Sequence, residues 1–188
     1  MWGGIHSAKV APGEAIGIIG IGGLGSLAVQ FAKALGHPVV AIDNRPEGRE
    51  LATEAPLKAD LVLDSETPEA VSKVKEFVGK GGLAAIIVCT DTVSVTEWSL
   101  NLLRPNGVCV PLGLPVAGFH FNAFTAVFQQ ITVVGSLVAT QAETQKMLDT
   151  VAKHGIRSHL TVLPLEEAIH LPERYMDKHL KGRLVVKL

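Results

Sequence analysis

Short, uniformly apolar runs alternate along the chain with stretches whose apolar residues recur at helical spacing. A strand buried on both faces forms a continuous apolar run, and strands that alternate with helices typically pair in parallel. The pattern therefore predicts an α/β fold with a parallel, doubly wound sheet and helices on both faces. The predicted strands are 15–19, 38–42, 61–63, 83–89, 108–112 and 131–134, and the predicted helices are 24–35, 46–55, 67–78 and 92–103.

The rhythm of the pattern changes after about Thr140. An amphipathic helix is predicted at 141–154, followed by a strand at 160–163, a helix from Leu165 and a last strand at 183–187. A length of 188 residues suits one domain with a tail. We therefore expect a main domain of residues 1–140 and a C-terminal tail of residues 141–188.

The run Gly20-Ile21-Gly22-Gly23-Leu24-Gly25 matches the pattern GxGxxG between a predicted strand and a predicted helix. Asp43 ends the second strand twenty-three residues after Gly20, close to the spacing of about 20 found in dinucleotide-binding folds. Gly20 would permit a tight turn, Gly22 would let the backbone approach a pyrophosphate, and Gly25 would let the helix pack closely on the strand. Asp43 would accept hydrogen bonds from the adenosine ribose. The spacing predicts a Rossmann-type dinucleotide-binding domain.

Two other interpretations of this turn stay open. It could be a tight strand–helix connection without a ligand, or it could bind S-adenosylmethionine in a methyltransferase. Methyltransferases usually carry an acid at or just before the first glycine, where this chain has Ile18-Ile19. The carboxylate of Asp43 favours NAD over NADP because it would repel a 2′-phosphate. Arg45, two residues on, could instead embrace such a phosphate.

Charge and cysteine content narrow the function classes. Seventeen Lys and Arg against 18 Asp and Glu give a net charge of −1, so no nucleic-acid partner is expected. Cys89 and Cys109 form no zinc motif and no disulfide framework, which indicates a reducing, cytoplasmic compartment. The apolar stretch 15–29 is Gly-rich and shorter than the roughly 20 residues of a membrane span. Seven histidines lack metal-ligand spacing, and Asp91 is interpreted as a helix cap, so no metal site is predicted.

Several segments together resemble the medium-chain, zinc-type alcohol dehydrogenases. These segments lie at 10–14, 20–25, 30–36, 103–107, 112–115, 135–138 and 182–186. The resemblance covers nearly the whole chain in the right order. It implies an oxidoreductase that transfers hydride between an alcohol or carbonyl compound and NAD, with a small alcohol or aldehyde as the substrate of the complete enzyme.

The resemblance also implies which residues contact the cofactor. Many family members place a lysine five residues beyond the ribose-binding acid, where this chain has Gly48, so the adenosine contacts are weakened or pass to Arg49. Cys89 could instead be a buried apolar thiol, and Arg183 a surface residue. The implied contacts are Gly20, Gly22, Gly23, Leu24, Gly25 and Arg183 at the pyrophosphate, Asp43, Asn44, Arg45 and Arg49 near the adenosine ribose, Cys89 and Thr90 at the adenine and ribose pocket, Leu112, Gly113 and Leu114 beside the nicotinamide, and Ser136 and Leu137 near its carboxamide.

The Gly-His-Glu zinc motif and the zinc-binding cysteines of the family's N-terminal catalytic domain are not found in this sequence. Zinc is therefore expected only in that missing domain, no catalytic residue is predicted, and the isolated chain is expected to be inactive. A non-catalytic NAD(P)-binding sensor or structural module is the alternative. The family dimerises near the region of Phe119, Phe121, Phe124 and Phe128, which predicts a homo-oligomer through the cofactor domain; plain core is the other interpretation of these rings.

Overall fold

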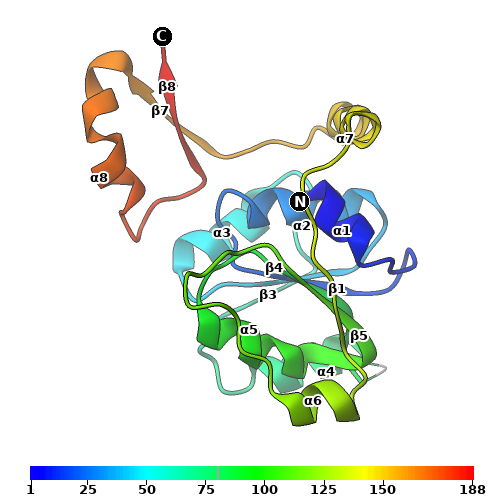
Figure 1. The fold of residues 1–188 in the computed structure, drawn as a ribbon. Coiled ribbons are helices and arrows are strands. Elements are labelled where there is room, and N and C mark those ends of the chain that lie inside the picture. Colours follow the sequence, from blue (N-terminus) through cyan, green and yellow to red (C-terminus); the bar gives the residue numbers. More distant parts are fainter. Residues whose placement is uncertain (80) are drawn as a thin grey trace.

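In the computed structural model, which describes residues 1–79 and 81–188, six strands form a parallel sheet in the order β3-β2-β1-β4-β5-β6 (Figure 1). The first strand lies at the centre: its Ile16 is paired with Val39 of β2 on one side and Ala85 of β4 on the other. The predicted doubly wound α/β fold is confirmed, because the strand order reverses between β1 and β4. The strands are β1 (Ile16–Ile19), β2 (Val39–Ile42), β3 (Leu61–Leu63), β4 (Leu83–Val88), β5 (Leu103–Pro111) and β6 (Thr132–Val133).

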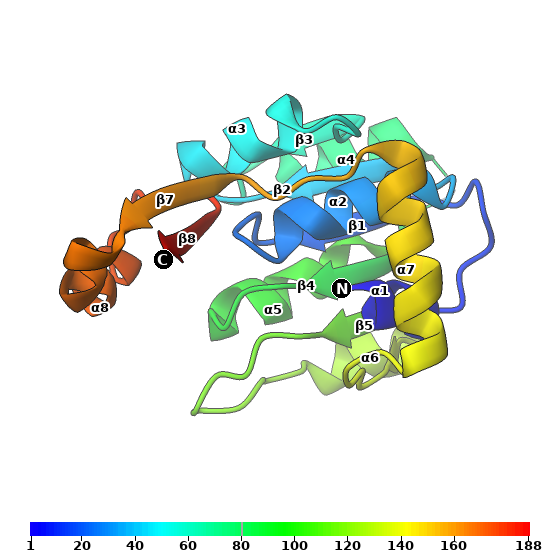
Figure 2. The same ribbon diagram turned by 90° about the horizontal axis from the view of Figure 1, so that it is seen from above.

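Helices cover both faces of the sheet (Figure 2). The face covered by α1, α2, α3 and α7 forms one core cluster, and the face covered by α4, α5 and the 3-10 turn η1 forms another. The last helix before β6 is the short α6. These elements are α1 (Trp2–Ser7), α2 (Gly25–Ala34), α3 (Pro46–Glu54), α4 (Ala70–Val78), α5 (Val93–Ser99), η1 (Leu100–Leu102), α6 (Ala123–Phe128) and α7 (Gln141–His154).

Alternation along the central strands divides their side chains between the two clusters. Ile16 and Ile18 of β1 face the cluster under α1 and α2, whereas Ile19 faces the cluster under α4. Successive side chains of a strand point to opposite faces, so a sheet covered on both sides needs apolar residues at every position. Every residue of β1, β2 and β4 is accordingly buried, as their unbroken apolar runs predict.

Several local differences separate the predicted elements from the observed ones. The helices α1 and α6 were not expected from the pattern. The helix predicted from residue 67 begins at Ala70, whose N–H donates to the Thr67 carbonyl at 2.9 Å. Arg104-Pro105-Asn106-Gly107 predicts a turn before the strand, and in the structure these residues lie inside β5 as an irregularity in its pairing with β4, with Asn106 at φ 59°. The glycines of segment 79–82 predict a break after the helix of 67–78, and position 80 of this segment lies outside the described residues.

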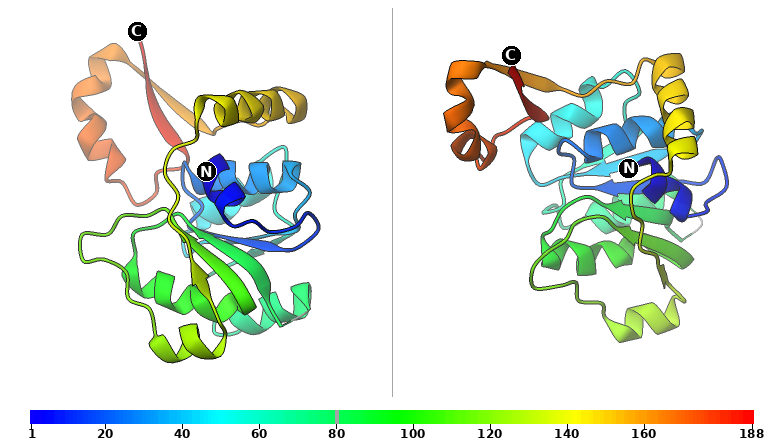
Figure 3. Two further views of the ribbon diagram at one scale, coloured as in Figure 1. Left: turned by 45° about the vertical axis from the view of Figure 1, so that its right-hand side comes forward. Right: turned by 45° about the horizontal axis from the view of Figure 1, so that its top comes forward.

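The C-terminal segment forms a second, two-stranded parallel sheet beside the first (Figure 3). Its elements are β7 (Leu160–Pro164), the 3-10 helix η2 (Leu165–His170), α8 (Leu171–Tyr175) and β8 (Arg183–Lys187). Helix α7 packs on the main core through Met147 and Val151, and Ile156 after it is buried. The division after residue 140 stays a prediction. Among the described residues, no helix is long and apolar enough to cross a membrane.

Candidate functional site

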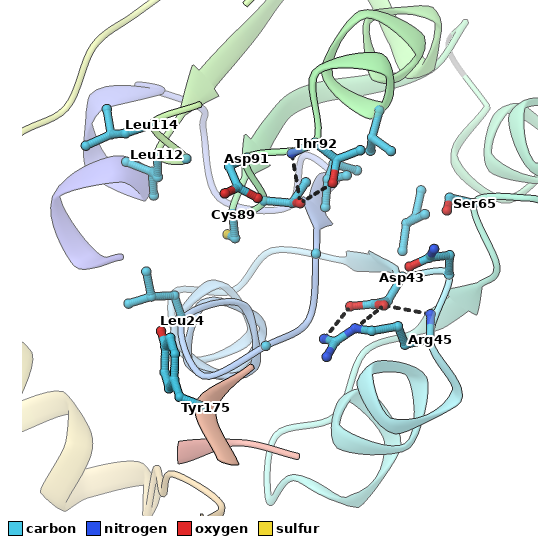
Figure 4. A pocket seen from close by; sticks show the side chains of 18 residues that line it. Leu24, Asp43, Arg45, Ser65, Cys89, Asp91, Thr92, Leu112, Leu114 and Tyr175 are labelled. Carbon is cyan, nitrogen blue, oxygen red and sulfur yellow. Dashed lines mark hydrogen bonds and ion pairs between the residues drawn. The ribbon is translucent and has the colours of Figure 1, made fainter. Parts of the chain in front are cut away.

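A cavity of about 640 Å³ opens at the carboxyl ends of the parallel strands (Figure 4). It lies where the strand order reverses between β1 and β4, which is where open α/β sheets bind their ligands. Eleven of the seventeen predicted contact residues line it: Gly20, Gly22, Leu24, Asp43, Asn44, Arg45, Cys89, Thr90, Leu112, Gly113 and Leu114.

 The other six predicted contacts lie outside this lining: Gly23, Gly25, Arg49, Ser136, Leu137 and Arg183.

The glycine-rich turn joins β1 to α2 with very little room for side chains. Gly20 has φ +86°, and a Cβ atom there would lie 3.1 Å from the Thr90 Cβ. A Cβ at Gly25 would lie 2.0 Å from the Gly20 carbonyl oxygen, so the first turn of α2 lies against the end of β1. Gly22 is open on the cavity side, since a Cβ there would meet only the Arg45 Nη2, at 3.9 Å.

Asp43, directly after β2, is the most enclosed charged group of the cavity. Its side chain is 3% exposed. The Ile21 N–H donates to its Oδ2 at 2.6 Å, and the Arg45 N–H donates to its Oδ1 at 2.8 Å. A Cβ at Gly48 would lie 2.4 Å from the Asp43 Cγ, so glycine at this position lets α3 pack directly against the carboxylate. The acid is therefore held in place by the backbone N–H groups of the glycine-rich turn and of Arg45, the N-cap of α3.

The two arginines near Asp43 differ in where they point. Arg45 lines the cavity, and its Nε and Nη2 donate to the Asp43 carboxylate, each at 3.3 Å. Arg49 is absent from the lining: its Nη1 donates to the carbonyls of Asp43 and Asn44 at 3.0 and 2.7 Å and lies 2.9 Å from Asp64 Oδ2. Arg49 is thus bound to the backbone carbonyls of Asp43 and Asn44, whereas Arg45 places a positive charge on the cavity wall.

The loop after β4 forms the wall opposite Asp43. Burial raises the pKa of the Cys89 thiol to about 12, and its Sγ donates to the Ile87 carbonyl at 3.7 Å, so the group is a neutral thiol. Thr90 Oγ1 donates to Thr92 Oγ1 at 3.1 Å. The helix-cap interpretation of Asp91 is wrong, because the N-cap of α5 is Thr92; Asp91 is exposed and lines the cavity.

The loop after β5 closes the far end of the cavity. Leu112 and Gly113 both donate their N–H groups to the Val88 carbonyl, at 2.8 and 3.2 Å. Ser136 and Leu137 do not line the cavity. They lie beside α1, where a Cβ at Gly3 would be 3.3 Å from both the Ser136 Oγ and the Leu137 carbonyl oxygen.

Arg183, at the start of β8, lies against the glycine-rich turn although it does not line the cavity. A Cβ at Gly23 would lie 2.8 Å from its Cγ and 3.2 Å from its Nε. The tail is also tied to α3, since Lys181 Nζ lies 3.0 Å from Glu50 Oε2 and 2.7 Å from Glu54 Oε2. These contacts bring a residue from the end of the chain to the turn near its start.

Sequence reasoning missed part of the lining. Ser65 and Thr92 follow β3 and β4 by a few residues, so the rule that ligands meet the carboxyl ends of parallel strands could have found them. Val95 comes from the first turn of α5, and Tyr175 from α8 in the tail. No local pattern marks Tyr175, because its place depends on how the tail docks.

Within residues 1–79 and 81–188, no group of three or more His, Cys, Asp or Glu side chains is arranged to hold a metal ion.

The strand order, the glycine-rich turn and the acid after β2 define a Rossmann-type fold with its cavity at the strand-order reversal. The family model described as zinc-binding dehydrogenase matches residues 23–153. The chain belongs to this family.

Curated relatives and solved structures agree with that assignment. The chain is 36% identical to an alcohol dehydrogenase of Geobacillus stearothermophilus, over 94% of this chain and 51% of the relative. It is 34% identical to an alcohol dehydrogenase of Rhizobium meliloti, over 98% of this chain and 53% of the relative. Acetophenone reductase from Geotrichum candidum, solved in complex with NAD, matches with a TM-score of 0.84 and 26% identity over 98% of this chain and 51% of that one. The chain thus spans about half the length of the relatives it matches.

Proposed function

We propose that this chain is the nicotinamide-dinucleotide-binding part of an alcohol-dehydrogenase-like oxidoreductase that uses NAD. The observation that carries the proposal is the cavity in which the glycine-rich turn meets the buried Asp43 carboxylate, bonded to the Ile21 N–H at 2.6 Å. The similarity to a reductase solved with NAD supports the same cofactor. When bound, the nicotinamide ring supplies the acceptor or donor of hydride.

The cavity fits an extended dinucleotide. The open face of Gly22 and the helix start at Gly25 suit a pyrophosphate, and Arg183 beside Gly23 supplies a nearby cation. Asp43 with Asn44 suits the adenosine ribose, and Cys89 with Thr90 forms the neighbouring wall. Leu112, Gly113 and Leu114 suit the nicotinamide face. We propose that Ser136 and Leu137, which lie beside α1, contact the carboxamide of the nicotinamide.

The remaining parts of the proposal concern the complete enzyme. Its substrate would be a small alcohol or aldehyde, and its zinc would be held by a catalytic domain outside the matched half. We propose a cytoplasmic location and a main domain of residues 1–140 with a tail of residues 141–188. The short edge strand β6 and the exposed rings of Phe124 and Phe128 support a homo-oligomer formed through the cofactor domain.

A fluorescence titration of the purified chain with NADH, with NADPH in parallel, tests the cofactor proposal. We expect saturable binding of NADH and weaker binding of NADPH. Asp43→Asn keeps the shape and one acceptor oxygen but removes the charge, and it should weaken NADH binding by about tenfold, which corresponds to ~1.4 kcal/mol. Absence of binding by a chain whose circular dichroism shows the folded state would overturn the proposal.

A further inference from the structure

A second cavity, of about 160 Å³, lies between α2, α3 and the linker of residues 155–159, which joins α7 to β7 (Figure 2). Of the described residues, none lines both this cavity and the cavity of about 640 Å³, so the two are separate. A molecule of liquid water occupies about 30 Å³, so the second cavity has room for an ion of several non-hydrogen atoms. Its polar lining residues are Ser26 and Gln30 of α2, Glu54 of α3, and Arg157, Ser158 and His159 of the linker.

The buried side chain of Gln30 fixes the linker against α2. Its Nε2 donates to the carbonyls of Ser26 and Arg157 at 3.1 and 2.8 Å, and its Oε1 accepts from the Arg157 N–H at 3.1 Å. At the other end of the linker, the Arg183 N–H donates to the His159 carbonyl at 3.0 Å. The amide of Gln30 and these backbone groups are already bonded, so a ligand in the cavity would meet the other polar side chains.

The hydroxyl of Ser26 is the first sign of such a ligand. Ser26 is only 4% exposed, and within the described part of the chain its Oγ has no hydrogen-bond partner. Buried hydroxyls of native proteins are nearly always bonded, because an unpaired one loses its hydration and gains nothing in return. An unpaired hydroxyl on the wall of a cavity therefore indicates a polar group inside that cavity.

Arg157 carries the unpaired charge of the lining. Among residues 1–79 and 81–188 its guanidinium has no acceptor, whereas the Glu54 carboxylate lies 2.7 Å from Lys181 Nζ and is thereby balanced. The side chains of Ser158 and His159 also have no hydrogen-bond partner in this part of the chain. A guanidinium only donates, and hydroxyls and an imidazole can donate as well, so the free groups suit a negatively charged acceptor.

We propose that this cavity binds a small phosphate-type oxyanion, either inorganic phosphate or the phosphoryl group of a phosphomonoester, with Arg157 as its cation and Ser26 as its buried donor. The planar fork of a guanidinium matches the oxygens of a phosphate, and charge-assisted hydrogen bonds of this kind are strong. The bound ion would connect α2 with the linker and would give the Ser26 hydroxyl its partner. This site does not depend on the proposed dinucleotide site.

Calorimetric titration of the 188-residue chain with inorganic phosphate and, separately, with methyl phosphate tests the proposal. We expect saturable binding; methyl phosphate that binds as well as inorganic phosphate would identify a phosphomonoester site, and weaker binding of it would identify a site for the free ion. Arg157→Ala and Ser26→Ala should each raise the dissociation constant of phosphate by about tenfold or more, because each removes a hydrogen bond to a charged group.

Lys153→Ala is the control with the same change of charge. Lys153 is an exposed residue in the last turn of α7 and does not line the cavity, so the dissociation constant of phosphate should stay unchanged in this variant.

The thermal stability of Ser26→Ala gives a second measurement. In phosphate-free buffer this variant loses an unpaired buried hydroxyl and gains a better helix former, so its Tm should equal or exceed that of the wild type. Added phosphate should raise the Tm of the wild type, because a ligand that binds only the folded state stabilises it, and should raise the Tm of Ser26→Ala less. A lower Tm of Ser26→Ala in phosphate-free buffer would show that the hydroxyl is bonded within the fold and would contradict its proposed role.

The outcomes separate this inference from the proposed function. A folded wild-type chain that binds neither phosphate nor methyl phosphate, or an Arg157→Ala variant that binds phosphate as tightly as the wild type, would overturn the inference. Displacement of phosphate by saturating NADH would place the ion at the glycine-rich turn and would overturn it as well. If the chain binds phosphate in the expected way but does not bind NADH, the proposed function fails and the phosphate site stands on its variants.

Discussion

At the scale of single residues, two opposing effects decide how Gly48→Ala changes the free energy of unfolding, because Gly48 lies in close contact with Asp43. Alanine is a better helix former than glycine by about 1 kcal/mol, which would stabilise α3. A Cβ at position 48 would, however, stand 2.4 Å from both Cγ and Oδ2 of the buried Asp43. The clash should dominate, so Gly48→Ala should lower the free energy of unfolding by about 1–3 kcal/mol and weaken NADH binding. Chemical denaturation measures the first effect and fluorescence titration the second.

Gly135→Ala is the control for that substitution, since a Cβ there meets nothing within 4 Å. Its stability should stay within about 0.5 kcal/mol of the wild type. A Gly48→Ala variant as stable as Gly135→Ala would mean that α3 can move away from Asp43 at little cost.

The thiol of Cys89 gives a second prediction at this scale. Burial raises the pKa values of Cys89 and Cys109 to about 12, so almost no thiolate exists at neutral pH. Iodoacetamide at pH 7.5 should therefore modify the native chain far more slowly than the chain unfolded in urea, as followed by mass spectrometry. Rapid modification of Cys89 in the native chain would contradict the neutral-thiol description.

At the scale of elements, the contact between the tail and α3 should depend on pH. His179 Nδ1 lies 2.6 Å from Glu47 Oε1. This hydrogen bond raises the pKa of His179 above 6.5 and lowers that of Glu47 below 4.5; Asp177 and Lys178 also act on His179, with opposite signs. The contact is complete between those two ordinary values. It is lost as pH rises through the raised pKa of His179 and as pH falls through the lowered pKa of Glu47.

A titration of the His179 ring by NMR measures this directly. In Glu47→Gln the pKa of His179 should fall back toward its ordinary value, because both the hydrogen bond and the charge that raise it are weakened. Glu76→Gln, on an exposed position of α4, should leave the titration unchanged. Equal pKa values of His179 in the wild type and in Glu47→Gln would show that the tail does not dock on α3 in this way.

The helices and strands also show which parts of the fold can be predicted from the sequence alone. Strands such as β1 and β4 are predictable because burial on both faces makes them uniformly apolar. Helix α1 was missed because Gly3 and Gly4 are poor helix formers, and its stability comes instead from Trp2 packing edge-on against Phe31, 5.6 Å between ring centres. Asp43 and the glycine-rich turn were found by their spacing. The engagement of its carboxylate by Arg45 was not, because it depends on side-chain directions that spacing does not encode.

At the scale of the whole molecule, the chain by itself should bind cofactor without oxidising alcohols. This chain matches 51% of the Geobacillus stearothermophilus enzyme. We propose that the substrate and zinc sites of the complete enzyme lie outside the matched part. NADH formation from NAD and ethanol or other small alcohols, with zinc added, should therefore stay at the level of a blank without protein. Robust zinc-dependent turnover by the purified chain would overturn this expectation.

Exposed apolar side chains near the sheet edge predict self-association of the chain. Phe124, Val127 and Phe128 of α6 are 68%, 71% and 73% exposed, so the core interpretation of Phe124 and Phe128 is wrong. They precede β6, which is the last strand in the order of the main sheet. Exposed apolar side chains beside a strand at the edge of a sheet are a typical place for a second copy to pair.

Light scattering over a range of protein concentrations should therefore show dimers or larger species, and Val127→Glu should shift the population toward monomer. A charge placed inside a contact surface would be desolvated without a partner, so the dissociation constant of the dimer should rise by about tenfold or more, at ~1.4 kcal/mol per tenfold.

 Ile169→Glu, at a residue of η2 that is 80% exposed but distant in the chain from α6, supplies the control and should leave the association unchanged. A wild-type chain that stays monomeric at high concentration would show that the sheet edge is not a contact between copies of this chain.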